Sequence, residues 1–206
     1  MNQNEILSSL ALLAEDTVDF LSNTRKWERE CWVCLEFLKA LQVSASQNDL
    51  VKPDSEPPDV IFRDANFEVF IVLDKDRKIH LDWKQKLAVY RSAKSLEDLL
   101  EPYRPPRKIS GEKIITFLSP TLSKKHQDYT KRGISLGDID VLAYVNLNEY
   151  TLDFDTLFTG YSQLQQQGWR SISVFGNSYC RVLYARKSAP DFLRSCAGKT
   201  ITIVSQ

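Results

Sequence analysis

The chain has 206 residues, 43% of them hydrophobic and 26% charged, which is typical of a globular protein with a core that needs no disulfide or metal. Lysine plus arginine and aspartate plus glutamate each total 27, so net charge neither indicates nor excludes a nucleic-acid partner. The sequence has no run of ~18 apolar residues and no basic region before its first apolar stretch. We therefore expect no membrane span and no signal peptide, and predict a cytoplasmic protein.

The first half of the chain shows helical periodicity followed by strand-like alternation. The predicted elements are helices over 4–22 and Thr24–Leu41, a polar loop over Ser44–Pro58, and strands over Asp59–Phe62 and Phe67–Leu73 joined by a turn at Arg63–Asn66. An earlier strand is only faintly indicated within Val43–Val51. Residues of about 1–42 thus form an N-terminal helical part.

The second half alternates helices and strands. Residues 79–101 are predicted to form a charged helix, which is a candidate insertion and which Pro102 ends before a stiff basic linker. The later predicted elements are a helix over Pro120–Arg132 ending at Gly133, a buried strand over Ile139–Val145, a hairpin of Trp169–Phe175 and Ser178–Ala185 turning at Gly176-Asn177, a helix near Asp191 and a strand near Thr200. This order predicts a single α/β domain over residues 1–206, with a central mixed sheet flanked by helices.

Cys31 and Cys34 have the spacing of a redox or metal-binding pair but lie inside a predicted helix. Redox pairs favour a helix N-terminus, and a zinc site needs a second pair of ligands. We therefore favour the interpretation that both thiols pack in the core.

Glu30 lies on the same predicted helix, within its apolar arc between Phe37 and Leu41. A buried carboxylate needs a partner, because burying an unpaired charge costs several kcal/mol. An ion pair with a nearby arginine or lysine is the simpler explanation, and a metal or substrate ligand is the alternative.

Two further acidic residues lie in the predicted strand pair. Glu68 shares a face with Phe70 and Val72, while Asp59 opens the preceding strand. A cation is one way to hold two carboxylates together, and Mg²⁺ accepts one or two carboxylates together with water and phosphate oxygens. The alternative is that Glu68 lies at a sheet edge and faces water.

Pro58-Asp59, an eight-residue gap and then Glu68-Val69-Phe70 resemble the PD-(D/E)xK signature of restriction-endonuclease-like nucleases. The chain also resembles an uncharacterised bacterial domain family of proposed endonucleases, along essentially its whole length. The segments that carry this second resemblance are 23–30, 57–70, 168–171 and 189–193.

The resemblance implies a restriction-endonuclease-like fold in which Asp59 and Glu68 hold Mg²⁺ and Glu30 completes the site. Phe70 stands where the signature has a lysine, which polarises or orients the attacking water. Superfamily members sometimes supply that lysine from a neighbouring helix, and Ser123–Tyr129 resembles such a helix. Lys125 shares its apolar face, whereas Lys124 points away, so Lys125 is the predicted substitute.

The hypothesis favoured by these residues is Mg²⁺-dependent hydrolysis of phosphodiester bonds in nucleic acid, with DNA as the expected substrate. In this hypothesis Asp59, Glu68 and Glu30 are metal ligands and Lys125 stabilises the transition state. A second hypothesis is a non-catalytic module on the same fold, binding nucleic acid through the basic segments 103–108 and 124–132. A third is a protein-interaction adaptor, suggested by exposed aromatic residues such as Trp169. Oligomeric state stays open.

Overall fold

The computed structural model describes residues 2–102, 104–153, 161–176 and 179–202. Within these ranges the chain forms two compact units. The first, which we call the helical unit, consists of Met1–Arg29 and Leu73–Pro105. The second, the sheet unit, consists of Glu30–Val72 and Pro106–Gln206. The predicted N-terminal helical part is therefore divided between the two units.

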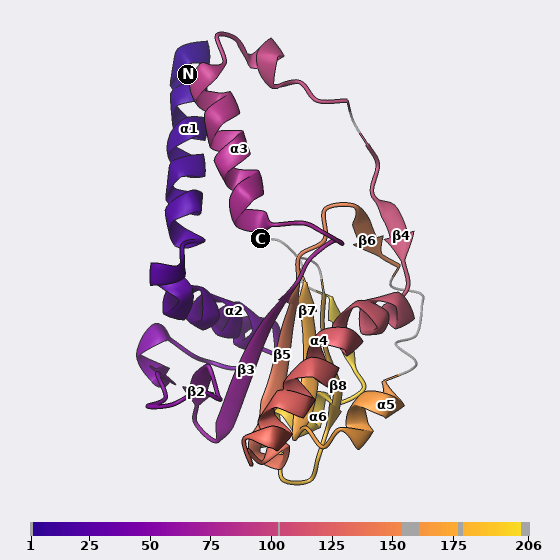
Figure 1. The fold of residues 1–206 in the computed structure, drawn as a ribbon. Coiled ribbons are helices and arrows are strands. Elements are labelled where there is room, and N and C mark those ends of the chain that lie inside the picture. Colours follow the sequence, from indigo (N-terminus) through magenta and orange to yellow (C-terminus); the bar gives the residue numbers. More distant parts are fainter. Residues whose placement is uncertain (1, 103, 154–160, 177–178, 203–206) are drawn as a thin grey trace. The chain divides into compact units, whose positions relative to one another are not determined.

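The helical unit is built on two helices, α1 (Gln3–Phe20) and α3 (Ile79–Ser92), which run antiparallel (Figure 1). Asn2 and Glu5 form a capping box that satisfies free backbone amides at the start of α1. The Gln3 side chain donates to the Lys94 carbonyl over 3.3 Å. Residues that lie close together in space in this unit are thus far apart in the sequence.

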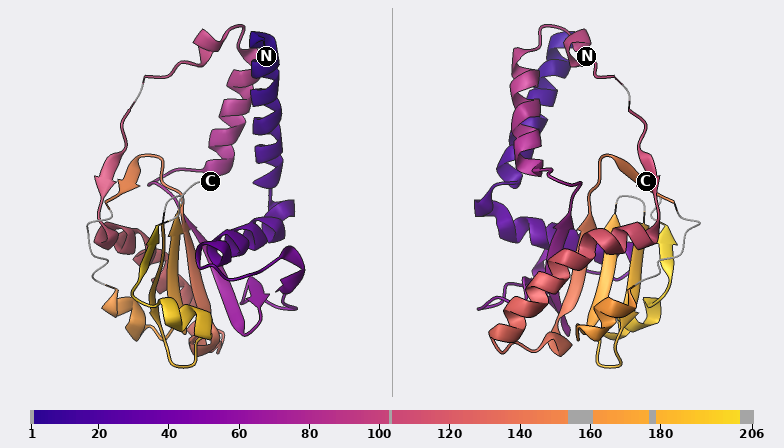
Figure 2. Two further views of the ribbon diagram at one scale, coloured as in Figure 1. Left: turned by 180° about the vertical axis from the view of Figure 1, so that it is seen from behind. Right: turned by 45° about the vertical axis from the view of Figure 1, so that its right-hand side comes forward.

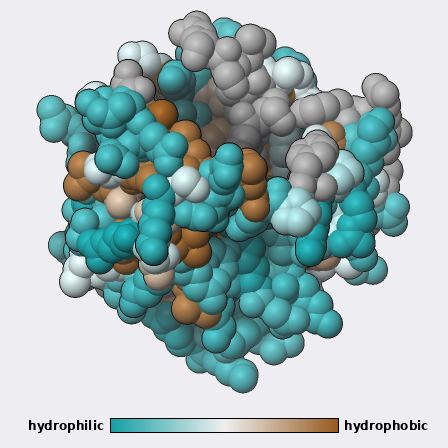
Figure 3. Space-filling model, turned by 90° about the horizontal axis from the view of Figure 1, so that it is seen from above, coloured by the Kyte–Doolittle hydropathy of each residue, from teal (hydrophilic) through white to brown (hydrophobic). Residues whose placement is uncertain are grey.

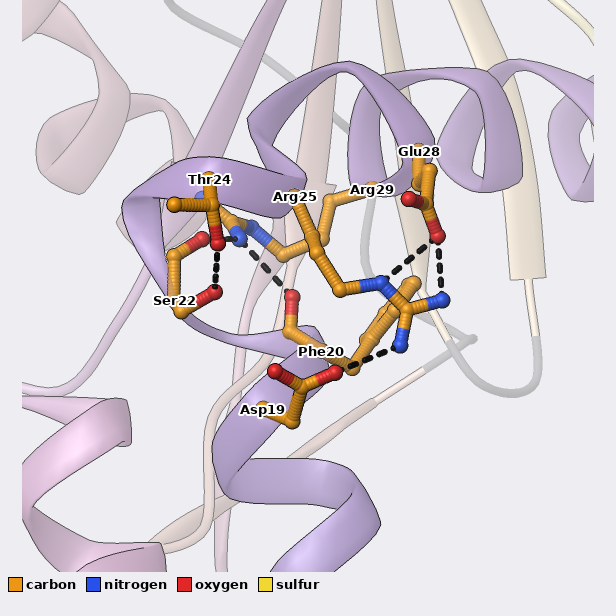
Figure 4. A network of polar contacts seen from close by, with 7 residues as sticks. All are labelled: Asp19, Phe20, Ser22, Thr24, Arg25, Glu28 and Arg29. Carbon is orange, nitrogen blue, oxygen red and sulfur yellow. Dashed lines mark hydrogen bonds and ion pairs between the residues drawn. The ribbon is translucent and has the colours of Figure 1, made fainter.

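A polar network fixes the turn after α1, where the short 3₁₀ helix Asn23–Arg25 leads into α2 (Lys26–Ala40). Arg25 pairs with Asp19 at 2.8 Å and with Glu28, so one guanidinium joins both helices (Figure 4). Arg29 donates to the carbonyls of Phe20, over 2.8 Å, and Ser22. The bond to Phe20 satisfies a carbonyl at the end of α1, where the helix itself supplies no further amide donors.

The sheet unit contains a seven-stranded mixed sheet in the order β1-β2-β3-β5-β7-β8-β9. Strands β3, β5 and β7 are parallel at its centre, and the pairs on either side of them are antiparallel. The bounds are β1 Leu50–Val51, β2 Val60–Phe62, β3 Ala65–Val72, β5 Asp140–Val145, β7 Ser171–Gly176, β8 Tyr179–Ala185 and β9 Thr200–Thr202. All residues of β5 and β7 are buried, as expected for central parallel strands.

Helices cover both faces of this sheet (Figure 2). On one face, α4 (Gly111–Lys131) and α5 (Ser162–Gln166) pack on the main core, which includes Leu118, Val141 and Ile172. On the other face, α2 packs through ring contacts such as that between Phe37 and Phe67, 5.9 Å apart. The helix α6 (Asp191–Cys196) lies on this second face too. Each face of β3 therefore meets a different helix.

A second, two-stranded sheet pairs β4 (Arg107–Ile109) with β6 (Tyr150–Leu152) in parallel. It borders a cavity of about 290 Å³ in the sheet unit. The cavity is lined by Ile109, Ile114, Val145, Leu147, Asn148, Tyr150, Thr151, Leu152 and Tyr179.

The predicted α/β class and central mixed sheet flanked by helices are confirmed. The faint first strand exists as the two-residue β1. Asp59 precedes β2 rather than lying in it, and β3 begins at Ala65, which shortens the predicted turn to Arg63-Asp64. Gly133 follows α4 with a φ of +70°, as predicted for a residue that ends a helix. Asn177 and Ser178 of the predicted hairpin lie outside the described residues.

Two predicted helix boundaries are wrong. The helix expected over 79–101 ends at Ser92, because Ser95 and Asp98 form a capping box that begins a separate 3₁₀ turn, Leu96–Leu99. The helix expected to begin at Pro120 begins at Gly111 instead, where the Ser110 hydroxyl accepts from the Lys113 amide. Pro120 lies inside that helix.

Further differences concern short elements and burial. The predicted linker after Pro102 contains β4, and β6 and α5 were not predicted. Trp169, expected to be exposed, is completely buried, and its indole N–H donates to Gln167. Cys31 and Cys34 are buried free thiols, as predicted. None of the helices in the described ranges is long and apolar enough to cross a membrane.

Candidate active site

Glu68 is a charged residue in the interior of the sheet unit. It lies near the middle of β3, between β2 and β5, and its side chain is 1% exposed. Alternation along the strand places Glu68 on the face of Phe70 and Val72, which packs against α4. The alternative expectation, that Glu68 faces water at a sheet edge, is wrong.

The Glu68 carboxylate meets two side chains of α4. Oε1 accepts a hydrogen bond from Lys125 Nζ over 2.6 Å and another from the Tyr129 hydroxyl over 2.6 Å. Lys125 Nζ also lies 3.0 Å from the Tyr129 hydroxyl oxygen, so the three groups form a closed triangle. The second oxygen, Oε2, is buried and has no hydrogen-bond partner within the described part of the chain. A buried polar atom without a hydrogen-bond partner destabilises the folded state, unless a water molecule, an ion or a ligand binds it.

Two opposing influences act on the ionisation of this cluster. Burial raises the pKa of Glu68, and the nearby Asp59 charge raises it further, while bonds from Lys125 and Tyr129 act in the opposite direction. The net direction is upward. Burial, together with the bond to Glu68, also raises the pKa of Tyr129. Tyr129 thus stays a neutral hydrogen-bond donor across the physiological range.

The position of Lys125 follows from the periodicity of α4. Leu118, Leu122, Lys125 and Tyr129 recur at intervals of three or four residues, which places them on one face of the helix. The Lys125 ammonium lies 5.5 Å from the centre of the Phe70 ring. Its side chain remains 39% exposed, so it links the buried carboxylate with solvent. The structure places Lys125 beside the residue that stands at the motif lysine position, as expected.

Asp59 lies immediately before β2 and is held by hydrogen bonds to β3. Its amide donates to the Phe67 carbonyl over 2.9 Å, and its Oδ2 accepts from the Val69 amide over 2.9 Å. The residue is 8% exposed. Since its charge also acts on Glu68, the structure brings both carboxylates of the predicted signature into one electrostatic neighbourhood.

Glu30 is not gathered with this pair into a metal-binding group. It lies in α2 one turn before Cys34, and its charge, after burial and the charges of Cys31 and Asp59, raises the pKa of the Cys34 thiol. Among the residues that the structure describes, no three or more histidine, cysteine, aspartate or glutamate side chains are arranged to hold a metal ion. The expected three-carboxylate centre is therefore not formed here.

The basic segments predicted for nucleic-acid contacts are both partly exposed. Within 124–132, Lys124 and Lys131 are exposed on α4. Arg132, which follows the helix, is also exposed and donates to the Glu56 carbonyl over 2.8 Å. In the segment 103–108, Tyr103 lies outside the described residues. Arg107 pairs there with Glu149 at 2.8 Å.

A second buried polar cluster was not predicted from the sequence. Asp140, at the start of β5, is completely buried and accepts from Arg170, from the Ser171 hydroxyl at 2.7 Å and from the Asn66 amide at 3.0 Å. Arg170 also donates to the Asp64 carbonyl over 2.8 Å. The sequence signal for this cluster is a charged residue near the beginning of two strands, Asp140 as the first residue of β5 and Arg170 directly before β7. Because its groups are paired, this cluster is an anchor for β3, β5 and β7.

Tyr129 is the other residue that the sequence-based site lacked. Its signal was available, because it lies four residues after Lys125 on the same face of the helix. An aromatic residue on a helix face is normally assigned to the core, and Tyr129 is indeed buried there. Only the structure reveals that its hydroxyl is aimed at Glu68.

Comparisons with known proteins show the family of this chain but give two different descriptions of activity. A family model described as "Putative endonuclease, protein of unknown function (DUF1780)" matches residues 2–205. A solved structure of PA4535, a protein of unknown function from Pseudomonas aeruginosa strain PAO1, is 40% identical with a TM-score of 0.73. That match covers 100% of this chain and 98% of the other, which is described as a member of the monooxygenase superfamily. No curated protein matches the chain. Since the family model spans almost every residue, the chain belongs to the DUF1780 family.

Proposed function

We propose that this protein is a Mg²⁺-dependent nuclease with a restriction-endonuclease-like fold, and that Lys125 replaces the lysine of its signature. The observation that carries the proposal is the 2.6 Å contact between Lys125 Nζ and Glu68 Oε1. A lysine from α4 reaches the strand carboxylate at the position where Phe70 interrupts the signature. The family description as an endonuclease supports the same activity.

The donor set fits a hard divalent cation in part. Glu68 Oε2 is a buried oxygen with no hydrogen-bond partner in the described ranges. The charge of Asp59 raises the pKa of the Glu68 carboxyl group. Mg²⁺ is commonly held by one or two carboxylates together with water and substrate phosphates. Asp59 and Glu68 would therefore hold the ion. When bound, Mg²⁺ would supply charge neutralisation at phosphorus and a lowered pKa for water.

The side chains around Glu68 have separate roles in this proposal. Tyr129 donates to Oε1 and so fixes the rotation of the carboxylate, which leaves Oε2 available. Lys125 carries a positive charge at the boundary between the buried carboxylate and solvent, where the negatively charged phosphate of a substrate would approach. Its ammonium would stabilise the charge that develops on phosphate oxygens in the transition state.

The order of elements supports the restriction-endonuclease-like fold. Helix α2 precedes the antiparallel strands β1, β2 and β3, and α4 then precedes β5, which is parallel to β3. The two carboxylates lie on β3 and just before β2, and the lysine lies on the helix before the next central strand. These are the positions that the resemblance to the superfamily implies.

Nucleic acid is the proposed substrate because exposed cations accompany the site. Lys124 and Lys131 lie on the same helix as Lys125, Arg132 directly follows that helix, and all three are exposed. Such side chains would bind backbone phosphates without reading sequence, and their contribution should weaken steeply with salt. DNA is the proposed form of the substrate.

A non-catalytic nucleic-acid-binding module is the second candidate. It is favoured by the absence of a three-ligand metal group among the described residues. In this case the triangle of Glu68, Lys125 and Tyr129 would be purely structural. Both candidates predict salt-sensitive DNA binding, but only the first predicts that Mg²⁺ is needed for a chemical step.

Cleavage of supercoiled plasmid, single-stranded DNA and RNA, each with Mg²⁺ or with EDTA, tests the proposal. The expected result is Mg²⁺-dependent cleavage of DNA that disappears in Asp59→Asn and Glu68→Gln. Glu36→Gln, a substitution of a half-buried glutamate of α2 outside the proposed site, is a matched control and should retain cleavage. DNA binding without cleavage of any substrate would favour the non-catalytic module. Cleavage by all variants alike would indicate a contaminant or another site.

A further inference from the structure

The cavity of about 290 Å³ in the sheet unit is separate from the proposed nuclease site. Every described residue that lines it belongs to the sheet unit, so its walls do not depend on the position of the helical unit. Ile114, in the first turn of α4, lines the cavity, whereas Lys125 lies eleven residues later on the same helix. At a rise of 1.5 Å per residue these two positions are roughly 16 Å apart along the helix axis.

The cavity lies where two of the central parallel strands end. Val145 is the last residue of β5, and Gly176 is the last residue of β7. Tyr179, the first residue of β8, is the antiparallel partner of Gly176. Both Val145 and Tyr179 line the cavity. Open α/β sheets commonly bind ligands outside the carboxyl ends of their parallel strands, which is the position of this cavity.

Gly176 allows the ring of Tyr179 to form one wall of the cavity. A Cβ atom at position 176 would lie 2.6 Å from Tyr179 Cε1, which is closer than side-chain contacts allow. The ring therefore packs directly on the backbone of β7. Burial raises the pKa of the Tyr179 hydroxyl, which thus stays neutral. This wall is a fixed aromatic surface without charge.

The floor of the cavity is apolar and its rim is polar. The floor consists of four buried aliphatic side chains, Ile109, Ile114, Val145 and Leu152. Asn148 and Thr151 also line the cavity but are exposed, so they provide polar groups at its rim. None of the described lining residues carries a charge. A mostly apolar lining with a few polar groups is typical of small-molecule sites.

Hydrophobicity of the molecular surface does not by itself identify such a site. Figure 3 shows hydrophobic side chains reaching the surface between hydrophilic ones, and scattered side chains of this kind are ordinary. The cavity differs because its aliphatic side chains are buried and surround one hollow. An apolar ligand in this hollow would remove its own surface and theirs from water, which is favourable.

The charges beside the rim favour a neutral ligand. The Arg107 guanidinium lies 5.2 Å from the centre of the Tyr150 ring, which lines the cavity. Arg107 pairs with Glu149 at 2.8 Å, so its charge is compensated. An anionic ligand would find no opposite charge among the described lining residues, and burial of an unpaired charge is strongly unfavourable.

The volume of the cavity indicates the size of its ligand. A cavity of roughly 150 Å³ lined by leucine, isoleucine and phenylalanine is large enough for benzene. The cavity of this protein, at about 290 Å³, has room for a bicyclic ring with one polar substituent. Tyr150 and Tyr179 provide aromatic contacts for such a ring.

We infer that this cavity binds a neutral aromatic molecule of one or two rings. The ring lies against the buried aliphatic floor, and a hydroxyl or N–H group of the ligand faces the polar rim formed by Asn148 and Thr151. Asparagine and threonine side chains can both donate and accept hydrogen bonds, so either kind of group is suitable. The inference does not depend on the proposed nuclease activity.

Methyl NMR of the full-length protein with indole, 2-naphthol or benzyl alcohol tests the inference. These probes are neutral aromatic molecules with one N–H or hydroxyl group. At least one of them should shift the methyl signals of Ile114, Val145 and Leu152 in a saturable way. The methyl signals of Val60, on β2, should not change. Benzoate, a charged probe of similar size, should bind at least about tenfold more weakly than the best neutral probe.

Two substitutions assign the binding to the cavity. Val145→Phe fills the cavity from its floor, and Thr151→Trp fills it from the exposed rim, where the larger side chain does not overpack the core. Each should weaken binding of the neutral probe by at least about tenfold. Thr121→Trp is the matched control and should leave binding unchanged, because Thr121 is an exposed threonine of α4 outside the lining. Circular dichroism verifies that each variant retains the fold.

Three results would overturn the inference. The first is the lack of saturable methyl shifts with all three neutral probes. The second is binding that Thr151→Trp weakens no more than Thr121→Trp does, because the probe would then bind elsewhere. The third is benzoate binding as tight as that of the neutral probes, which would contradict a site that selects against charge.

Discussion

Lys125 donates a hydrogen bond to Glu68 over 2.6 Å, although the two residues are 57 positions apart in the sequence. Glu68 is almost fully buried on β3, whereas the Lys125 side chain is 39% exposed on α4. The contact therefore connects an interior carboxylate with the surface. With Tyr129 it satisfies Oε1 and leaves Oε2 of the same carboxylate without a partner in the described chain.

The raised pKa of Glu68 predicts a specific dependence of stability on pH. Because its folded-state pKa lies above the ordinary value of 4.5, the native state binds more protons than the unfolded state between these two values. The contribution of Glu68 to stability is fully present below pH 4.5 and is lost as pH rises through the folded-state pKa. The variant Glu68→Gln has no ionisable group at this position, so it does not lose stability in this way as pH rises. Its side-chain oxygen can still accept hydrogen bonds from Lys125 and Tyr129.

The free energy of unfolding of Glu68→Gln should therefore increase, relative to the wild type, as pH rises above 4.5. Urea unfolding in EDTA at a series of pH values measures the difference. EDTA is needed because a bound cation would stabilise the charged wild type by mass action. A difference that is constant from pH 4 to 8, or that falls with pH, would contradict the buried and unfavourable ionisation of Glu68.

Tyr129→Phe should raise the pKa of Glu68 above its wild-type value, because it removes a hydrogen bond to the charged carboxylate. It should also lower the free energy of unfolding by about 1 kcal/mol. NMR titration of labelled glutamate side chains reports the pKa directly. Tyr184→Phe is the matched control, since Tyr184 donates to the Trp169 carbonyl over 3.1 Å elsewhere in the unit. If Tyr184→Phe shifted the pKa of Glu68 as much as Tyr129→Phe does, the shift could not be assigned to the hydrogen bond between Tyr129 and Glu68.

Arg170→Ala should destabilise the sheet unit by about 3–5 kcal/mol, because it leaves the buried Asp140 charge without compensation. The exposed pair of Arg107 and Glu149 provides the comparison. Arg107→Ala should lower stability by less than about 1 kcal/mol. Urea unfolding of both variants measures the difference, and equal effects would show that the Asp140 cluster is not the anchor of the central strands.

Periodicity along single elements predicted the parts of the site that lie on one face of one element. Glu68 could be placed on the face of Phe70, and Lys125 on the apolar face of its helix, because each assignment depends only on local spacing. The mixed sheet could be predicted for the same reason, from the order of strand and helix patterns. The contact between Glu68 and Lys125 was an expectation from family resemblance, not from spacing.

Relationships between elements could not be predicted in this way. The cluster of Asp140 and Arg170 depends on strands β3, β5 and β7 lying side by side, and no local pattern encodes that neighbourhood. The pairing of α1 with α3 is of the same kind. The start of α4 was missed because proline is typical of the first turn of a helix, so Pro120 indicated a start there. The helix begins instead at Gly111, after the Ser110 cap.

Stabilisation by Mg²⁺ should require both carboxylates of the proposed site. Mg²⁺ should raise the melting temperature of the wild type, because an ion that binds only the folded state stabilises it. Asp59→Asn should melt at the same temperature with and without Mg²⁺. Thermal unfolding with and without excess Mg²⁺ gives the comparison. A wild-type melting temperature that does not change with Mg²⁺ would contradict the proposal that the site binds this ion.

The most direct test of the central claim compares Lys125→Ala with Lys124→Ala in DNA cleavage with Mg²⁺. The two lysines are adjacent on α4, but only Lys125 contacts Glu68. We predict that Lys125→Ala loses cleavage by at least about 100-fold, the scale of removing one group that stabilises transition-state charge. Lys124→Ala should cleave at a rate close to that of the wild type, with weaker DNA binding at most. Equal cleavage by the two variants would contradict the role of Lys125 as the replacement for the motif lysine.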